Sequence, residues 1–312
     1  MLTAADVAAA AERIEPHVER TPVLTSASLD ADCGASLFFK CENFQKIGAF
    51  KARGAMNAVL LLDDDAAARG VATHSSGNHG AALARAAAIR GIACTVVVPR
   101  GANKAKLANM RRHGAKLVEC EPTQRGREST LADVVAGSGA TVVHPYADDA
   151  VMAGQGTVAM ELFAQVDALD LLIVPLGGGG LIAGCATWVA EHFPGTRVIG
   201  VEPDGAADCV ASIEAGRVVP VEPDTIADGL RATVGAPNLA IIRERVERVV
   251  TVSDAEIASA MRDIMERMKI VVEPSCAVGL AAIQAGSIDV QGLRAGIVLT
   301  GGNADLTDLF AS

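Results

Sequence analysis

Residues 42–54, ENFQKIGAFKARG, hold the transition on which the predicted fold depends, from a strand-like segment through a glycine-containing turn into a helix. Lys51 lies in this transition between Phe50 and Ala52, in an apolar setting. A lysine taken at random would extend along the first helical turn to reach water. The alternative is an amine that reacts with a carbonyl, which requires a partly desolvated site. The stretch by itself leaves both interpretations open.

The rest of the chain alternates short β-branched runs with alanine-rich stretches. Apolar strands that are each followed by a helix indicate parallel sheets covered on both faces, which is an α/β fold. A length of 312 residues favours two domains, and no flexible linker separates them. The expected strands are SLFFKCEN, GVATHS, CTVVVP, AKLVEC, ATVVHP, DLLIVPL, TRVIGVE and AGIVLTG, and the expected helices include 52–62, 78–90, 103–112, 149–165, 181–193 and 256–269.

Composition excludes several classes of partner. The formal net charge of −10 argues against nucleic acid and against an anionic membrane surface, since both require a basic face. Seven cysteines without a C-x-x-C pair indicate buried thiols in a reducing compartment, so we expect a cytoplasmic protein. The N-terminal TAAD resembles a helix cap and predicts no signal peptide.

Residues 171–190 carry no charge and are long enough to span a bilayer. Pro175 and four consecutive glycines near the middle would break a spanning helix. A buried strand, a glycine loop and a helix explain the segment better. We therefore expect a soluble protein with no membrane partner.

Three strand-to-helix junctions are unusually rich in glycine and polar residues. They are THSSGNHG (73–80), PLGGGGLIAG (175–184) and LTGGNADL (299–306). Ligands of open parallel sheets bind beyond the carboxyl ends of the strands. Together with the Lys51 junction, these three segments predict the walls of a single site.

The glycine loop, Gly177–Gly180, predicts a phosphate cradle of bare backbone amides at a helix start. A tight turn needs only one or two glycines, and the loop matches neither the nucleoside-triphosphate motif nor G-x-G-x-x-G. In SSGNHG, helix capping by Ser75 or Ser76 is the simpler interpretation, but it leaves Asn78 and His79 unexplained. A reactive lysine, a phosphate cradle and polar groups for a ring predict pyridoxal phosphate, held as a Schiff base on Lys51.

Seven motifs along almost the whole chain resemble the serine racemase and serine/threonine dehydratase family, pyridoxal-phosphate enzymes of fold type II, the tryptophan-synthase-β type. The motifs are FQKIGAFKARGAMNAV, THSSGNHG, VHPYADDAVMAGQGT, VPLGGGGLIAG, TIADGL, MERMKIVVEPSCAVG and GIVLTGGNADLT. The resemblance implies a large cofactor-binding domain (1–47 plus 147–312), a small domain (48–146), and an active site in the cleft between them. It also implies a homodimer.

The resemblance assigns roles to individual residues. Lys51 and Ser76 would be catalytic, on opposite faces of the ring, and Ser76 would keep racemisation possible. Arg127 aligns with an arginine near the substrate in the racemases. The cofactor would be bound by Phe50, Lys51, Asn78, Gly177, Gly178, Gly179, Gly180, Leu181 and Thr300, and the substrate by Ser75, Ser76, Asn78, His79 and Arg127.

A metal site is implied in EPDGAAD (202–208), where Glu202, the Ala206 carbonyl and Asp208 would bind Mg²⁺, or Ca²⁺ or Mn²⁺ in its place. The alternative is two solvated acids at a helix start. The chain also departs from the family pattern at Ile47, Ala49, Tyr146 and Ala232, which bears on substrate choice.

These features predict an ammonia-lyase that converts serine, threonine or threo-3-hydroxyaspartate to 2-oxo acids and ammonia, with Lys51 removing the α-proton. A distal carboxylate would need a cation, for which Arg127 and Arg231 are the candidates. A serine racemase with dehydratase side activity is the nearest alternative, followed by a non-catalytic amino-acid or nucleotide sensor. The preferred substrate, its stereochemistry, nucleotide activation and the identity of the metal stay open at this point.

Overall fold

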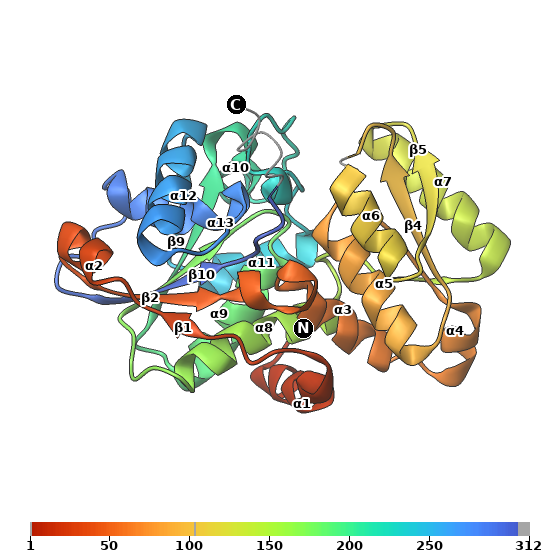
Figure 1. The fold of residues 1–312 in the computed structure, drawn as a ribbon, viewed down its shortest axis with the longest axis horizontal. Coiled ribbons are helices and arrows are strands. Elements are labelled where there is room, and N and C mark those ends of the chain that lie inside the picture. Colours follow the sequence, from red (N-terminus) through yellow and green to blue (C-terminus); the bar gives the residue numbers. More distant parts are fainter. Residues whose placement is uncertain (1, 103, 305–312) are drawn as a thin grey trace.

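A computed structural model describes residues 2–102 and 104–304, and within them ten strands form two separate sheets (Figure 1). Neighbouring strands are parallel except for the pair β1 and β2. The predicted α/β fold is confirmed. In spatial order the larger sheet contains β1 (Val23–Leu24), β2 (Ser36–Cys41), β10 (Arg294–Leu299), β7 (Leu171–Pro175), β8 (Arg197–Pro203) and β9 (Arg248–Val252), and the smaller contains β5 (Lys116–Cys120), β4 (Cys94–Pro99), β3 (Val71–His74) and β6 (Thr141–Val142).

Helices cover both faces of each sheet. The first helix begins where the TAAD segment predicts, because Thr3 caps it and forms a capping box with Asp6. The α-helices are α1 (Ala4–Ile14), α2 (Ala27–Cys33), α3 (Lys51–Leu60), α4 (Asp64–Arg69), α5 (Asn78–Arg90), α6 (Lys104–Arg112), α7 (Gln124–Ser138), α8 (Asp149–Phe163), α9 (Gly180–His192), α10 (Asp208–Ala215), α11 (Ala236–Arg245), α12 (Asp254–Met268) and α13 (Pro274–Gln284). Short 3₁₀ turns are η1 (Glu15–His17), η2 (Glu42–Phe44), η3 (Lys46–Gly48), η4 (Asp204–Ala206) and η5 (Asp228–Leu230).

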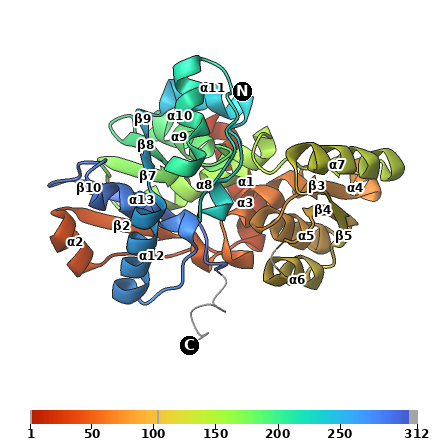
Figure 2. The same ribbon diagram turned by 90° about the horizontal axis from the view of Figure 1, so that it is seen from above.

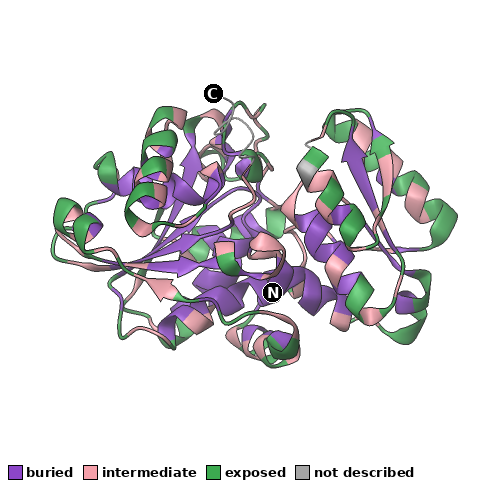
Figure 3. Ribbon diagram, in the orientation of Figure 1, coloured by how far each residue is buried: buried purple, intermediate pink, exposed green. Residues whose placement is uncertain are grey.

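Strand β7 shows why the central strands are apolar throughout. Successive side chains of a strand point to opposite faces, so Ile173 packs on the side of α12 and α13, and Leu172 and Val174 pack on the side of α8 and α9. All five residues of β7 are buried (Figure 3). The uncharged segment 171–190 thus forms a strand, a glycine loop and a helix, as predicted. No helix in the described part of the chain is long and apolar enough to cross a membrane.

The two sheets use different parts of the chain. All strands of the smaller sheet come from residues 71–142, and those of the larger sheet come from 23–41 and 171–299. Helix α3 lies between the two units (Figure 2), and its Met56 shares one apolar cluster with Ile14, Val96 and Val151. The boundaries expected at 47/48 and 146/147 stay a prediction.

Candidate active site

Lys51 is brought beside the TGGN segment by backbone pairing. The Phe50 N–H donates to the Thr300 carbonyl at 3.0 Å, and the Gly302 N–H donates to the Gly48 carbonyl at 2.9 Å. Ala49 and Gly301 form an isolated β-bridge between these bonds. Two junctions about 250 positions apart in the sequence therefore meet at the carboxyl end of β10, as the parallel-sheet argument predicts. Residues 305–307, at the end of the GIVLTGGNADLT motif, lie outside the described residues.

The Lys51 amine points into the protein. Its Nζ donates to the Pro145 carbonyl oxygen at 2.9 Å and lies 5.0 Å from the centre of the Phe50 ring. Burial lowers the pKa of Lys51 to about 8. An amine with this pKa is partly neutral near physiological pH, which is the form that attacks a carbonyl. The geometry favours the reactive interpretation over a lysine that extends to water.

The glycine loop at the start of α9 is bare and buried. Helix α9 has no side-chain hydrogen bond at its N-cap, Gly179, whose φ of +85° is a conformation that favours glycine. A Cβ at Gly178 would lie 2.4 Å from the Tyr146 ring, so the loop tolerates no side chain there. The unpaired amides at a helix N-terminus, with Leu181 in the first turn, suit a phosphate.

The SSGNHG junction begins α5, and here the structure corrects one interpretation. Gly77 is the N-cap residue and no side chain in the described part of the chain caps the helix, so capping by Ser75 or Ser76 is wrong. The Ser75 hydroxyl instead accepts the Gly77 N–H at 3.2 Å, and Ser76 is exposed. Both hydroxyls lie on the loop that precedes Asn78, which leaves Ser76 open to solvent and to a ligand.

Asn78 and His79 point to different surroundings. The Asn78 amide nitrogen donates to Glu273 Oε1 at 2.8 Å, and its oxygen accepts from Asn303 at 2.9 Å. His79 is buried with its Nε2 3.2 Å from the Val143 carbonyl, and burial together with the Lys51 charge lowers its pKa to about 3. His79 is therefore a neutral ring, and its assignment to the substrate stays a prediction.

A row of rings leads away from Lys51, and sequence reasoning missed most of it. The His144 ring lies edge-on to Tyr146, 4.5 Å between centres, and 6.3 Å from His74. His144 Nδ1 accepts the backbone N–H groups of Tyr146 and Ala147 at 3.3 and 2.9 Å, so its proton sits on Nε2. Burial, with the charges of His74 and Lys51, lowers the His144 pKa to about 4. The signal for this row in the sequence was a histidine at or just after the end of each of two strands, His74 for β3 and His144 for β6.

Arg127 lies at the far end of this row, on the first turns of α7. Its Nε is buried and has no hydrogen-bond partner among the described residues. The His74 pKa is lowered by burial and then by the Arg127 charge, so the two side chains are close. Arg231, the other cation considered, is exposed and donates through Nε to the Thr225 carbonyl at 3.0 Å. Arg127 is the cation that faces inward.

Glu202 and Asp208 lie together in the larger unit, and no third acid, histidine or cysteine joins them in the described part of the chain. Both are buried, Glu202 accepts two backbone N–H groups at 3.1 Å, and Asp208 accepts the Val234 N–H at 2.6 Å. Burial and the neighbouring Asp208 raise the Glu202 pKa to about 8, and burial raises that of Asp208 to about 6. The alternative of two solvated acids is wrong, since both are buried.

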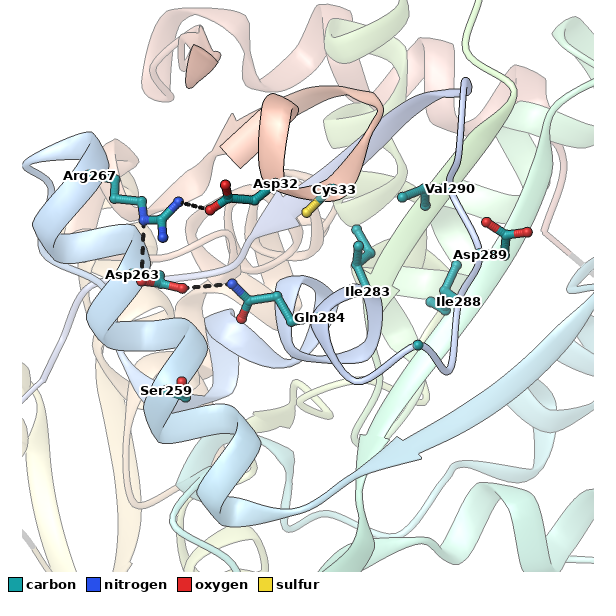
Figure 4. Close-up of a pocket in the computed structure, with 11 residues that line it drawn as sticks. Asp32, Cys33, Ser259, Asp263, Arg267, Ile283, Gln284, Ile288, Asp289 and Val290 are labelled. Atoms are coloured by element: carbon teal, nitrogen blue, oxygen red, sulfur yellow. Dashed lines mark hydrogen bonds and ion pairs between the residues drawn. The ribbon is translucent and has the colours of Figure 1, made fainter. Parts of the chain in front are cut away.

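A separate cavity of about 570 Å³ lies between α2, α12 and α13 (Figure 4). Most of its charged side chains pair with each other, because Arg267 contacts both Asp32 and Asp263, and Asp263 accepts from Gln284 at 2.7 Å. None of the predicted site residues lines it. The cavity is therefore not the active site.

The residues at the Lys51 junction fit pyridoxal phosphate. The Thr300 hydroxyl is buried and has no partner among the described residues, which suits a group facing a ring nitrogen. The bare glycine loop suits the phosphate, and the Lys51 amine suits the aldehyde. Each of these three features is matched by one part of the cofactor.

The chain is similar to known proteins along almost its whole length. Residues 14–301 match the family described as "Pyridoxal-phosphate dependent enzyme". A β-hydroxyaspartate dehydratase of Paracoccus denitrificans (strain Pd 1222) is 50% identical over 305 residues, which cover 97% of each chain. A serine racemase of Arabidopsis thaliana is 47% identical and covers 96% of this chain and 93% of its own. The structure of maize serine racemase superposes with a TM-score of 0.96 at 42% identity, covering 99% of this chain and 96% of its own.

Proposed function

This chain belongs to the pyridoxal-phosphate dependent enzymes, and we propose that it is an ammonia-lyase acting on small β-hydroxy amino acids. The observation that carries the proposal is the Lys51 amine, which is desolvated and 2.9 Å from the Pro145 carbonyl, together with the Thr300 hydroxyl, which has no partner among the residues that the structure describes. When bound, pyridoxal phosphate supplies an aldehyde for an amine and a ring that withdraws electrons from the substrate α-carbon. The protein supplies the base and the orientation.

The reaction assigned to the site loses water and then ammonia. Lys51 Nζ takes the proton from the substrate α-carbon, the bond from the β-carbon to its hydroxyl breaks, and that hydroxyl gains one proton and leaves as water, so the substrate loses its α-proton and β-hydroxyl as H₂O in total. Addition of one water to the dehydrated product then releases ammonia and a 2-oxo acid, so no oxidant is required. The neutral Thr300 hydroxyl favours this prompt elimination, because a neutral partner does not keep a ring nitrogen protonated as a carboxylate would.

We place 3-hydroxyaspartate with serine and threonine in the substrate class. Two observations support this extension: the name of the Paracoccus denitrificans relative, and the inward guanidinium of Arg127, whose Nε has no partner in the described part of the chain. A buried guanidinium N–H without an acceptor is costly, and a substrate carboxylate would supply that acceptor.

A substrate panel tests the function. Purified enzyme is assayed for oxo-acid release from L- and D-serine, L-threonine and the hydroxyaspartate diastereomers, with and without Mg²⁺. We expect Arg127→Met to lower kcat/KM for hydroxyaspartate about 100-fold and that for serine less than about fivefold, because the lost charge pairs with the distal carboxylate. Arg231→Met is the matched control and should leave both values unchanged. No oxo acid from any substrate would refute the proposal.

Serine racemisation is the second candidate, and the exposed Ser76 hydroxyl supports it together with the name of the Arabidopsis thaliana relative. A hydroxyl on the ring face opposite Lys51 can return a proton there. Formation of D-serine from L-serine, followed by circular dichroism, measures this activity. Ser76→Ala should abolish it and spare oxo-acid release.

A divalent metal ion, Mg²⁺ or otherwise Ca²⁺ or Mn²⁺, is proposed at Glu202, the Ala206 carbonyl and Asp208. Burial raises the pKa of both acids, and the Asp208 charge raises that of Glu202 further, which a hard cation bound between them would relieve. We expect Mg²⁺ to raise the thermal unfolding temperature of the wild type and to have no such effect on Asp208→Asn.

The cytoplasmic location is supported by the cysteines, all seven of which are free thiols in the described residues. The homodimer rests on the family resemblance.

A further inference from the structure

The amide of Asn78 is bound on both of its sides. Its Nδ2 donates to Glu273 Oε1 at 2.8 Å, and its Oδ1 accepts from Asn303 Nδ2 at 2.9 Å. The oxygen and nitrogen of an asparagine amide are alike in shape, so hydrogen-bond partners decide which way the group points. Asn78 therefore depends on its two neighbours for its orientation.

Asn303 can offer Asn78 only a donor, because its own orientation is fixed. The same Asn303 Nδ2 donates to the Ile47 carbonyl at 2.8 Å, and a backbone carbonyl can only accept. If the Asn303 amide turned over, its oxygen would face two other oxygens, those of Ile47 and Asn78. Asn303 is thus locked with its nitrogen toward both.

The loop that supplies the Ile47 carbonyl packs closely against Asn303. Ile47 has φ +59°, which is unfavourable for a β-branched residue. The next residue, Gly48, has φ +74°, and a Cβ there would lie 2.7 Å from Asn303 Oδ1. The backbone accepts a strained conformation at the residue whose carbonyl meets Asn303.

Glu273 fixes the other side of the Asn78 amide. It is buried, and its Oε2 has no partner in the described residues. Burial raises the Glu273 pKa to about 7, although the Lys106 charge lowers it. Oε1 accepts a hydrogen bond whether or not the acid is protonated on Oε2. Since one Asn78 N–H is given to Glu273, the second N–H is left for a ligand.

We propose that Asn303 is a positioning residue, which orients the Asn78 amide so that its second N–H donates to the ring oxygen of pyridoxal phosphate. The inference rests on the proposed function, because it assumes that the cofactor binds at Lys51 and Asn78. A hydrogen bond donated to an ionised oxygen favours the ionised form. Asn303 therefore lowers the pH at which the ring hydroxyl of the resting holoenzyme loses its proton.

The test is a double-mutant cycle on the holoenzyme, read by pH titration of the visible absorbance without substrate. We expect Asn303→Ala to move the midpoint upward by about one pH unit, a tenfold change in the ratio of the two forms. In the Asn78→Ala background the same substitution should move it by less than about 0.2 units, because Asn303 acts through Asn78. Asn43→Ala is the matched control, since Asn43 also donates to a backbone carbonyl, that of Val271 at 3.1 Å.

Three outcomes overturn the inference. The first is an Asn303→Ala midpoint equal to that of the wild type. The second is an Asn303→Ala shift of the same size in the wild-type and Asn78→Ala backgrounds, and the third is an Asn43→Ala shift as large as that of Asn303→Ala. The last two would indicate a general loosening of the loop. If Asn303→Ala does not fold, Asn303→Ser, which keeps a short donor, takes its place in the same cycle. Failure of the proposed function is distinguishable, because the wild-type protein itself would then show no visible absorbance that depends on Lys51.

Discussion

Two basic side chains in the first turn of α3, Lys51 and Arg53, are both directed inward and are surrounded in opposite ways. Arg53 is fully buried and makes hydrogen-bonded ion pairs with Glu42 and Glu161, each at 2.7 to 2.8 Å. Among the described residues, Lys51 has one acceptor, the Pro145 carbonyl, at 2.9 Å. Burial lowers the pKa of both, but attraction to the two acids raises that of Arg53 overall.

The difference shows what separates a structural cation from a reactive one. Two carboxylates compensate the desolvation of Arg53 and lock η2, α3 and α8 together. A carbonyl oxygen carries no full charge, so the desolvation of Lys51 stays uncompensated and its proton is held weakly. The same helical turn therefore anchors the site with one residue and presents the reactive amine with the other.

The largest expected effect comes from breaking the paired cation. Arg53→Leu leaves the buried Glu42 without its ion-pair partner and leaves Glu161 paired with Lys40 alone, and we expect the free energy of unfolding to fall by about 3–5 kcal/mol. Urea unfolding followed by circular dichroism measures the change. Arg53→Lys keeps the charge and should lose less. An unfolding midpoint of Arg53→Leu equal to that of the wild type would contradict the role assigned to Arg53.

In cofactor-free protein, Lys51→Ala should raise the free energy of unfolding, which is opposite to the effect expected of Arg53→Leu. The folded-state pKa of about 8 lies below the ordinary unfolded value of about 10.4, so the unfolded chain binds more protons and stability rises with pH between these values. With allowance for the partial exposure of the side chain, we expect Lys51→Ala to be more stable than the wild type by about 1–2 kcal/mol at pH 7. The gain should vanish near pH 10.5. Equal free energies of unfolding for the wild type and Lys51→Ala at pH 7 would show that burial does not destabilise the charged amine.

The rate of cofactor uptake should follow the neutral fraction of Lys51. With a pKa of about 8, that fraction rises about tenfold between pH 7 and pH 9. Stopped-flow absorbance with pyridoxal phosphate measures the rate, which should level off above pH 9. His79 and His144 are neutral throughout this range, with pKa values of about 3 and 4, so neither should contribute. A rate that still rises about sevenfold from pH 9 to pH 10 would indicate a lysine with its ordinary pKa.

The smallest effect is expected at an exposed ion pair, Arg100 with Glu121, whose side chains are 61% and 62% accessible. Solvent screens such pairs, so Arg100→Ala should change the free energy of unfolding by less than about 0.5 kcal/mol. Thermal unfolding of Arg100→Ala and of Arg53→Leu under the same conditions makes the comparison. A loss comparable to that of Arg53→Leu would show that burial is not what distinguishes Arg53.

Sequence patterns predicted the elements that carry strong local signals. Helix α5 has the predicted bounds, and the capping box at Thr3 marks α1. Strand β9 went unrecognised, because its residues RVVTV alternate little and lie at the edge of the sheet, where burial is incomplete. Strand β6 is shorter than expected, two residues in place of six, since the chain after Val142 turns to place His144 and Pro145 in the site.

The active-site residues likewise divide into those that strand positions predict and those that only side-chain contacts reveal. Lys51, the glycine loop and Thr300 lie at strand ends whose meeting the parallel fold dictates. Glu273 and Asn303 were not predicted, because they act through side-chain contacts between segments 195 and 225 positions from Asn78. The family resemblance favoured Arg127 over Arg231, but only packing shows that the Arg127 Nε is buried whereas Arg231 bonds the Thr225 carbonyl.

The most direct measurement is reduction of the freshly purified holoenzyme with borohydride, followed by peptide mapping by mass spectrometry. The contrast between Lys51 and the paired basic residues predicts a pyridoxyl group on Lys51 and none on Lys40, which is buried but held by Glu161 at 2.8 Å. A colourless protein, or a modified peptide in which Lys51 is untouched, would contradict it.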